Sequence, residues 1–183
     1  SLFADEKDER LDIYFIDVEG GAATLFVTPT GETLLIDSGY PDYGGRDRDR
    51  ILNVLRNVAG KDHLDHAAVT HWHLDHYGNH AALAAEIKIG QFWDRGIPDD
   101  LEEDKKFLER IADYRRASDN RSFTLKAGDM LPLLPSLKND TPISLDIVTA
   151  SREVIPNTGD PNPYADRHQP RKRLRQRKPD LCQ

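Results

Sequence analysis

The segment Thr70–His80, THWHLDHYGNH, constrains this chain more than any other part of its 183-residue sequence. It places four histidines and an aspartate within eleven residues, directly after a short apolar run that predicts a buried strand. His71 and His73 are two residues apart, so in an extended chain both side chains leave on the same side. Asp75 and His76 follow, where the pattern turns helical. Histidine nitrogen and aspartate oxygen both bind divalent ions such as zinc, so this spacing predicts a metal site.

A β-meander is predicted ahead of this segment. Residues 11–18 and 22–28 are rich in β-branched and aromatic residues and are separated by a Glu-Gly-Gly turn, which is typical of a hairpin. Residues 33–37 form a mostly apolar third strand that ends in a loop rich in glycine and proline. Residues 46–60 then carry apolar side chains at helical spacing and end on a glycine, as an amphipathic helix does.

The histidine-rich segment lies inside a predicted strand–loop–helix–strand unit. Residues 66–70 are too short an apolar run for a helix and predict a strand, 77–87 predict a helix, and 88–94 predict the next strand. In such a βαβ unit the loop that follows the first strand lies at the carboxyl edge of a sheet. A further helix is expected at 99–117, and short strands at 122–125, 127–134 and 143–150. The chain is therefore expected to be an α/β protein.

The two ends of the chain differ from its middle. Residues 165–183 hold seven Lys and Arg against two Asp and Glu and show no apolar period, which predicts a basic, disordered tail. We therefore divide the chain into a lead-in at 1–10, one domain at 11–164 and the tail at 165–183. The single cysteine, Cys182, excludes an intrachain disulfide.

Cellular location stays open on the sequence. No apolar stretch approaches the roughly 20 residues that a membrane-spanning helix needs, so the chain is expected to be soluble. The opening SLFA, followed by a charged run, fits the end of a removed signal peptide as well as an arbitrary cut. A cytoplasmic and an exported protein are both compatible with it.

The segment His71-Trp72-His73-Leu74-Asp75-His76 resembles the T-H-x-H-x-D-H signature of metallo-β-lactamase-fold metallohydrolases. Residues 12–39 are similar to the opening hairpin and the hhIDsG strand of that superfamily. The likeness is strongest to the hydrolase domain of bacterial DNA-uptake channel proteins, although residues 18–22 read VEGGA where that group has V-G-Q-G-D. The resemblance implies an αββα sandwich, of which this chain supplies roughly the first half.

The resemblance also implies roles for five residues. His71 and His73 correspond to ligands of a first metal ion, and Asp75 and His76 to ligands of a second. Asp37, at the end of its strand, corresponds to an aspartate that braces the site without touching the metal; an ordinary turn residue is the alternative. The family site holds two Zn²⁺ ions, and one or two are expected here. They activate a water that attacks an ester or phosphodiester bond, with Asp75 as a catalytic residue that handles the proton.

The remaining family ligands are not recognisable after His76, where the chain has two histidines, His80 and His168. Together with the abrupt change to Arg, Pro and Gln, this predicts a truncated or frame-shifted C-terminal end with the second sheet largely absent. Half a sandwich would expose an apolar sheet face and favour self-association. Three functions stay open: a zinc-dependent hydrolase of a small-molecule or phosphodiester substrate, an inactive fragment with partial metal binding, and a binding module whose tail holds nucleic acid or an acidic partner.

Several other residues are expected to pack rather than to bind a ligand. His80 lies one helical turn after His76, and His63 and His66 precede the buried strand in KDHLDH, which imitates the metal motif. Trp72 and Tyr77 flank the expected ligands, and packing against the loop is favoured for them over lining a substrate pocket.

Overall fold

Six strands form one mixed sheet in the computed structural model, which describes residues 10–135 and 143–156. The strand order is β1-β2-β3-β4-β5-β6. Pairing is antiparallel from β1 to β3 and parallel from β3 to β6. The strands are β1 Asp12–Phe15, β2 Thr24–Val27, β3 Thr33–Ile36, β4 His63–Ala68, β5 Lys88–Asp94 and β6 Phe123–Thr124.

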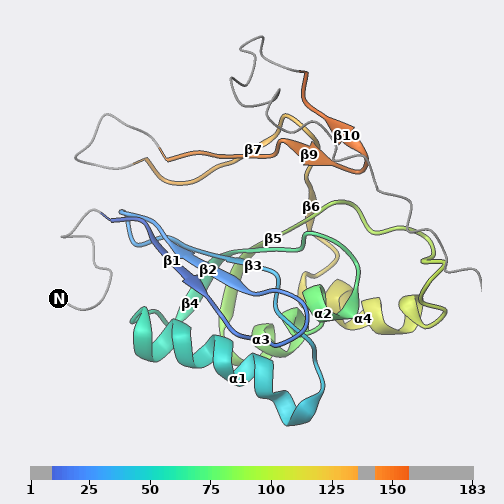
Figure 1. Ribbon diagram of the computed structural model, residues 1–183, viewed down its shortest axis with the longest axis horizontal. Coiled ribbons are helices and arrows are strands. Elements are labelled where there is room, and N and C mark those ends of the chain that lie inside the picture. Colours follow the sequence, from blue (N-terminus) through green and yellow to red (C-terminus); the bar gives the residue numbers. More distant parts are fainter. Residues whose placement is uncertain (1–9, 136–142, 157–183) are drawn as a thin grey trace, which may run out of the picture.

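Helices lie on one side of this sheet and two small ribbons on the other (Figure 1). The helices are η1 Tyr43–Gly45, α1 Arg46–Asn53 with its π-helical continuation η2 Val54–Val58, α2 Leu74–Tyr77, α3 His80–Glu86 and α4 Phe107–Ala117. The ribbons pair β7 Met130–Leu131 with β8 Leu145–Asp146, and β9 Thr149–Ala150 with β10 Glu153–Val154. Within the described ranges, no helix is long and apolar enough to span a membrane.

Strand register explains why the helices cover one face. Leu25, Leu35, Ala67 and Phe92 lie opposite one another across β2, β3, β4 and β5, so their side chains form one row on one face. All four are buried. Leu25 and Leu35 pack with residues of α1, η2 and α3, whereas Ala67 and Phe92 pack with α4. Burying this row removes apolar area from water and favours the packing of the helices on this face.

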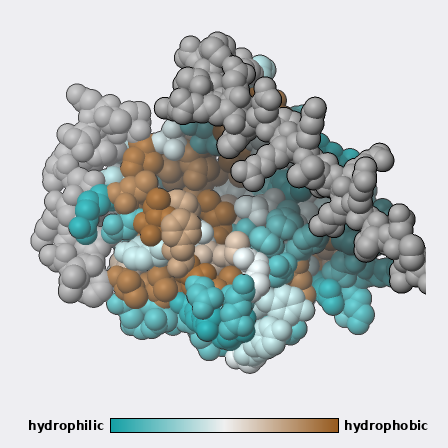
Figure 2. All heavy atoms as spheres, in the orientation of Figure 1, coloured by the Kyte–Doolittle hydropathy of each residue, from teal (hydrophilic) through white to brown (hydrophobic). Residues whose placement is uncertain are grey.

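The opposite face of the sheet is also apolar but is less well covered. Its row runs in register through Phe15, Thr24, Ile36, Ala68, Trp93 and Phe123, with Thr24 as the polar member. Leu131 and Leu145 of the β7–β8 ribbon pack over its middle, and both ends of the row stay exposed, with Phe15 at 85%. In Figure 2, hydrophobic residues gather where Figure 1 shows the main sheet and this ribbon. The predicted exposed sheet face is therefore present at both ends of the row; self-association through it stays a prediction.

Three predicted elements have different bounds in the structure. Strand β4 begins at His63 rather than 66, because His63 and Leu64 already pair with β5. The expected helix at 77–87 is present as α3 from His80, while Tyr77 ends the separate short helix α2. Between the two helices, the Asn79 side chain donates to the carbonyls of Ser38 and Tyr40. The expected helix at 99–117 begins only at Phe107. There, Asp104 accepts hydrogen bonds from the backbone of Lys106 and Phe107, which ends the preceding turns.

The expected late strands are shorter than their apolar runs. Residues 122–125 and 127–134 provide the two-residue strands β6 and β7, and 143–150 is divided between β8 and β9. Strand β10 was not expected. The helix predicted at 46–60 is present as α1 and η2, and Gly60 follows it with a φ of 67°, a conformation that favours glycine.

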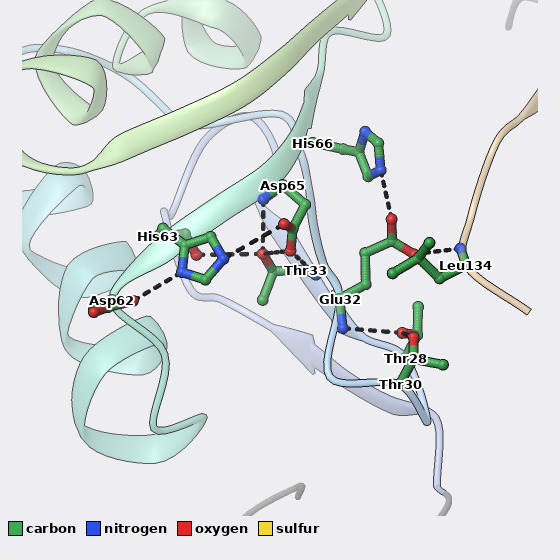
Figure 3. A network of polar contacts seen from close by, with 9 residues as sticks. All are labelled: Thr28, Thr30, Glu32, Thr33, Asp62, His63, Asp65, His66 and Leu134. Atoms are coloured by element: carbon green, nitrogen blue, oxygen red, sulfur yellow. Dashed lines mark hydrogen bonds and ion pairs between the residues drawn. The ribbon is translucent and has the colours of Figure 1, made fainter. Parts of the chain in front are cut away.

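His66 belongs to a buried polar network that ties the β7 segment to the sheet (Figure 3). The indole Nε1 of Trp93 donates to His66 Nδ1 at 3.1 Å, so the imidazole proton lies on Nε2 and is donated to Glu32 Oε1 at 3.0 Å. The second carboxylate oxygen of Glu32 accepts from the backbone of Leu134 at 2.7 Å. His66 therefore has a structural role, as expected, but within β4 rather than before it.

His80 is likewise a packing residue, at the start of α3. It is fully buried, and its Nδ1 lies 2.7 Å from Ser38 Oγ in the loop that follows β3. Burial lowers the pKa of His80 to about 4, so the side chain stays neutral over most of the acid range. The buried ring helps to fix the β3 loop against α3.

Acidification is expected to destabilise the protein through His80. Because its pKa is about 4 in the fold and about 6.5 in the unfolded chain, the unfolded state binds the proton first as pH falls. The free energy of unfolding should therefore drop between pH 6.5 and 4, by up to about 3 kcal/mol from this residue. Urea unfolding at pH 7 and pH 4.5 measures the loss. In His80→Gln the pH-dependent part should shrink; an unchanged difference between the two pH values would exclude His80 as its source.

Candidate metal centre

The histidine-rich segment follows β4 at the carboxyl edge of the sheet, as the βαβ pattern predicts. Trp72 is buried against Phe107 and Tyr114, and its Nε1 donates to the carbonyl of Gly96 at 2.7 Å. Because Trp72 points into the core, its neighbours His71 and His73 both point outward. Their ring centroids are 4.7 Å apart. Trp72 and Tyr77 are core residues, in agreement with the packing interpretation, and Trp72 also borders the adjacent groove.

Two nitrogens of this pair face each other. His71 Nε2 lies 3.1 Å from His73 Nδ1. Two nitrogens bound to one tetrahedral zinc ion at about 2.0–2.1 Å are roughly 3.3 Å apart. The pair therefore already has nearly the separation that a shared ion requires.

Asp75 and His76 form a second, wider pair. Asp75 Oδ2 lies 3.8 Å from His76 Nε2, which is longer than a shared ion allows without a side-chain rotation. The ring centroids of His76 and His71 are 3.9 Å apart with the ring planes tilted by 48°, so the two pairs are neighbours. The structure therefore brings the four predicted ligand residues together as two neighbouring pairs; their binding of metal stays a prediction.

Asp37 lies behind His76 and is 2% exposed. Its carboxylate accepts hydrogen bonds from His76 Nδ1 at 2.8 Å, from the Thr70 backbone at 2.8 Å and from Thr70 Oγ1 at 2.6 Å. The aspartate has a φ of 59°, a sparsely populated region for a residue other than glycine. Because Nδ1 is used to donate, His76 presents the lone pair of Nε2 away from Asp37.

Electrostatics favour the neutral form of His71. Burial lowers its pKa, and the nearby imidazoles of His76 and His73 lower it further. Neutral imidazole is the form that binds a metal ion. The cluster therefore favours the metal-binding form of this ligand.

The first hairpin turn rests directly on the metal segment. The Ala22 backbone donates to the carbonyl of Asp75, and Gly39 donates to the carbonyl of Ala22. A Cβ atom at Gly21 would overlap the Asp75 carbonyl, and the φ of Gly21 is 86°. Glycine is thus required where the turn touches Asp75.

A groove of about 1140 Å³ opens beside His71 and His73. Its apolar wall combines Ile36 of the less covered sheet face with Leu131 and Leu145 of the β7–β8 ribbon. Charged side chains from the loop after β5 and from the β9–β10 ribbon also border it. A substrate could therefore lie against an apolar wall with its polar end at the two histidines.

The described residues provide ligand pairs rather than a complete set. No group of three or more His, Cys, Asp or Glu side chains within 10–135 and 143–156 is arranged to hold one ion. His168, the late histidine considered from the sequence, lies outside these residues, as does the basic tail. The pairs His71–His73 and Asp75–His76 nevertheless have the donor chemistry of a zinc site, so a metal fits them in part.

Comparison with known families shows the family to which the chain belongs. The family model described as the metallo-beta-lactamase superfamily matches residues 16–172. The chain belongs to the metallo-beta-lactamase superfamily. Its mixed sheet and helices agree with the α/β fold of that family, and family membership indicates metal-dependent hydrolase chemistry in general. No curated protein matches the chain. The likeness to DNA-uptake channel proteins and the truncated C-terminal end therefore stay predictions.

Two residues that contact the predicted metal ligands were not predicted from the sequence. Thr70 precedes the first histidine, and its hydroxyl bridges Asp37 and His71 Nδ1, the latter at 3.1 Å. Glu103 comes from the loop between β5 and α4, and its Oε1 lies 3.5 Å from His73 Nε2. The threonine of the T-H-x-H signature is a sequence signal for the Thr70 contact. The contact of Glu103 with His73 depends on tertiary structure alone.

Proposed function

We propose that this protein is a zinc-dependent hydrolase that cleaves an ester or phosphodiester bond. The observation that carries the proposal is the approach of His71 Nε2 to His73 Nδ1 at 3.1 Å, next to the Asp75–His76 pair. In this proposal His71 and His73 hold one ion, and Asp75 and His76 hold a second. Bound zinc would activate a water and polarise the scissile bond.

The protein's own side chains supply orientation and proton handling. Asp37 fixes the His76 ring through Nδ1, so that Nε2 is the nitrogen available to a ligand. Asp75 has 38% of its side chain exposed, and its Oδ2 lies on the same side as His76 Nε2. In this proposal Asp75 would accept a proton from the attacking water and return one to the leaving group. The groove beside His71 would hold the substrate.

A second candidate function is metal binding without turnover. The observation that favours it is the lack, within the described residues, of a three-ligand group for one ion. A pair of ligands binds zinc more weakly than the three protein ligands typical of catalytic sites. A binding module whose basic tail holds nucleic acid lies outside the described residues and stays a third prediction.

Metal titration separates the two candidates. Protein treated with a chelator and then dialysed should regain hydrolysis of bis(p-nitrophenyl) phosphate or p-nitrophenyl acetate as zinc is added, with saturation at one or two ions per chain. A β-lactam assayed in parallel tests a third bond type. Stoichiometric zinc binding with no turnover of any substrate would support the second candidate. Failure to bind zinc would contradict both.

A further inference from the structure

His73 has a carboxylate partner that the metal motif does not contain. Its Nδ1 faces His71, while its Nε2 lies 3.5 Å from Glu103 Oε1. The imidazole therefore lies between His71 on one side and Glu103 on the other. We propose that Glu103 is a positioning residue that holds the His73 proton on Nε2 and leaves the Nδ1 lone pair for the metal. The inference rests on the proposed function, because it concerns a ligand of that site.

The loop that carries Glu103 is anchored to the metal segment at one end and to the start of α4 at the other. Gly96 donates to the buried carboxylate of Asp94 at 2.7 Å, and its carbonyl accepts from Trp72 Nε1. At the other end Asp104 accepts from Arg110 Nη1 at 2.9 Å and from the Lys106 backbone. Glu103 therefore belongs to a loop that is fixed through Trp72, the residue between the two histidines.

The contact completes a pattern shared by the three imidazoles. His71 Nδ1 meets Thr70 Oγ1, and His76 Nδ1 meets Asp37. The Thr70 hydroxyl already donates to Asp37, so it accepts from His71 Nδ1 and leaves the Nε2 lone pair of His71 facing inward. In this proposal the His73 proton lies on Nε2, 3.5 Å from Glu103 Oε1, and the lone pairs of His71 Nε2 and His73 Nδ1 face each other across 3.1 Å. A shared cation stabilises that arrangement.

Without Glu103, the histidine pair has an alternative that competes with the metal. His73 can then carry its proton on Nδ1 and donate it to His71 Nε2 across the same 3.1 Å. That hydrogen bond uses both inward nitrogens and must be broken before an ion binds. The side chains of His73 and Glu103 are 54% and 59% exposed, so solvent weakens their contact and it adds little to stability. Its effect should appear in metal binding rather than in folding.

The test compares zinc affinity in the full chain for wild type, Glu103→Ala, Glu103→Gln and the matched control Glu102→Ala. Glu103→Ala should weaken zinc binding about tenfold, the lower end of the range for residues that orient a metal ligand. Glu103→Gln keeps an acceptor oxygen and should largely restore the affinity. Glu102→Ala removes the same charge from the next residue of the groove border and should bind zinc as wild type does. Equal affinities in wild type and Glu103→Ala would overturn the inference.

A second readout is independent of turnover and of zinc binding. Nitrogen chemical shifts of His73 in chelator-treated protein, above pH 7.5, should show the Nδ1–H tautomer increasing in Glu103→Ala but not in Glu102→Ala. If the wild type binds zinc without turnover, the hydrolase proposal fails while both readouts still test Glu103. If it binds no zinc, the tautomer measurement alone decides, and an unchanged tautomer in Glu103→Ala would overturn the inference.

Discussion

Replacing His71 and His73 together by alanine is expected to remove one bound zinc ion per chain and to reduce turnover to background. The two imidazoles supply the closest pair of donor nitrogens in the centre, at 3.1 Å, and both point away from the core. Neither side chain supports the fold, so the free energy of unfolding should change by no more than about 0.5 kcal/mol. Zinc per chain after dialysis, chemical unfolding and the two chromogenic assays measure the three effects.

A matched control for this variant lies in the same strand unit. His63→Ala removes a histidine from the motif-like KDHLDH segment, where the ring contacts only the carboxylates of Asp62 and Asp65 in the described structure. It should retain full zinc content and turnover. Unchanged zinc content in the His71→Ala, His73→Ala protein would show that the ion binds elsewhere.

Asp37→Asn is expected to have the second largest effect, on metal affinity and on stability together. The buried carboxylate accepts three hydrogen bonds, two from Thr70 and one from His76. An asparagine tolerates the φ of 59° but cannot accept all three, so about 1–3 kcal/mol of stability should be lost. Because the His76 ring is no longer fixed, zinc affinity should fall about 10- to 100-fold. Urea unfolding and competitive zinc titration measure the two losses.

Asp47→Asn separates these two effects. Asp47 is also fully buried, and it accepts from the Tyr40 backbone and from Arg46 without touching a predicted ligand. Its replacement should lower stability and leave zinc affinity as in wild type. If Asp37→Asn and Asp47→Asn weaken zinc binding equally, Asp37 acts through general stability and not through His76.

The fold was predictable where one periodicity dominates a segment. The meander, the parallel βαβ unit and the helix ending at Gly60 each follow from local apolar spacing. Tertiary contacts decided the rest. Residues 99–106 are acidic and suit a helix start, but Asp104 ends their turns and α4 begins at Phe107. In the same way, the helix expected from residue 77 begins only at His80, directly after Asn79, whose side chain bonds to the loop after β3.

In the candidate site, too, some features follow from local sequence spacing and others depend on tertiary contacts. That His71 and His73 share a side follows from their spacing and from a buried Trp72 between them. The contact of Asp37 with His76 joins two adjacent parallel strands, and the resemblance of the IDSG strand to the superfamily predicted its role. The contact of Glu103 with His73 could not be predicted, because a glutamate within an acidic run does not indicate which side chain it contacts. The groove beside the histidines could not be predicted either, because its walls come from segments far apart in sequence.

X-ray absorption at the zinc edge tests the central claim most directly, because it reports the atoms around a bound ion. For protein loaded with one equivalent of zinc, we expect at least two imidazole nitrogens at about 2.0–2.1 Å, and a loss of this histidine signal in the His71→Ala, His73→Ala variant. A zinc shell without histidine in the wild type, or the same histidine shell in the variant, would contradict the assignment of these residues as the metal centre.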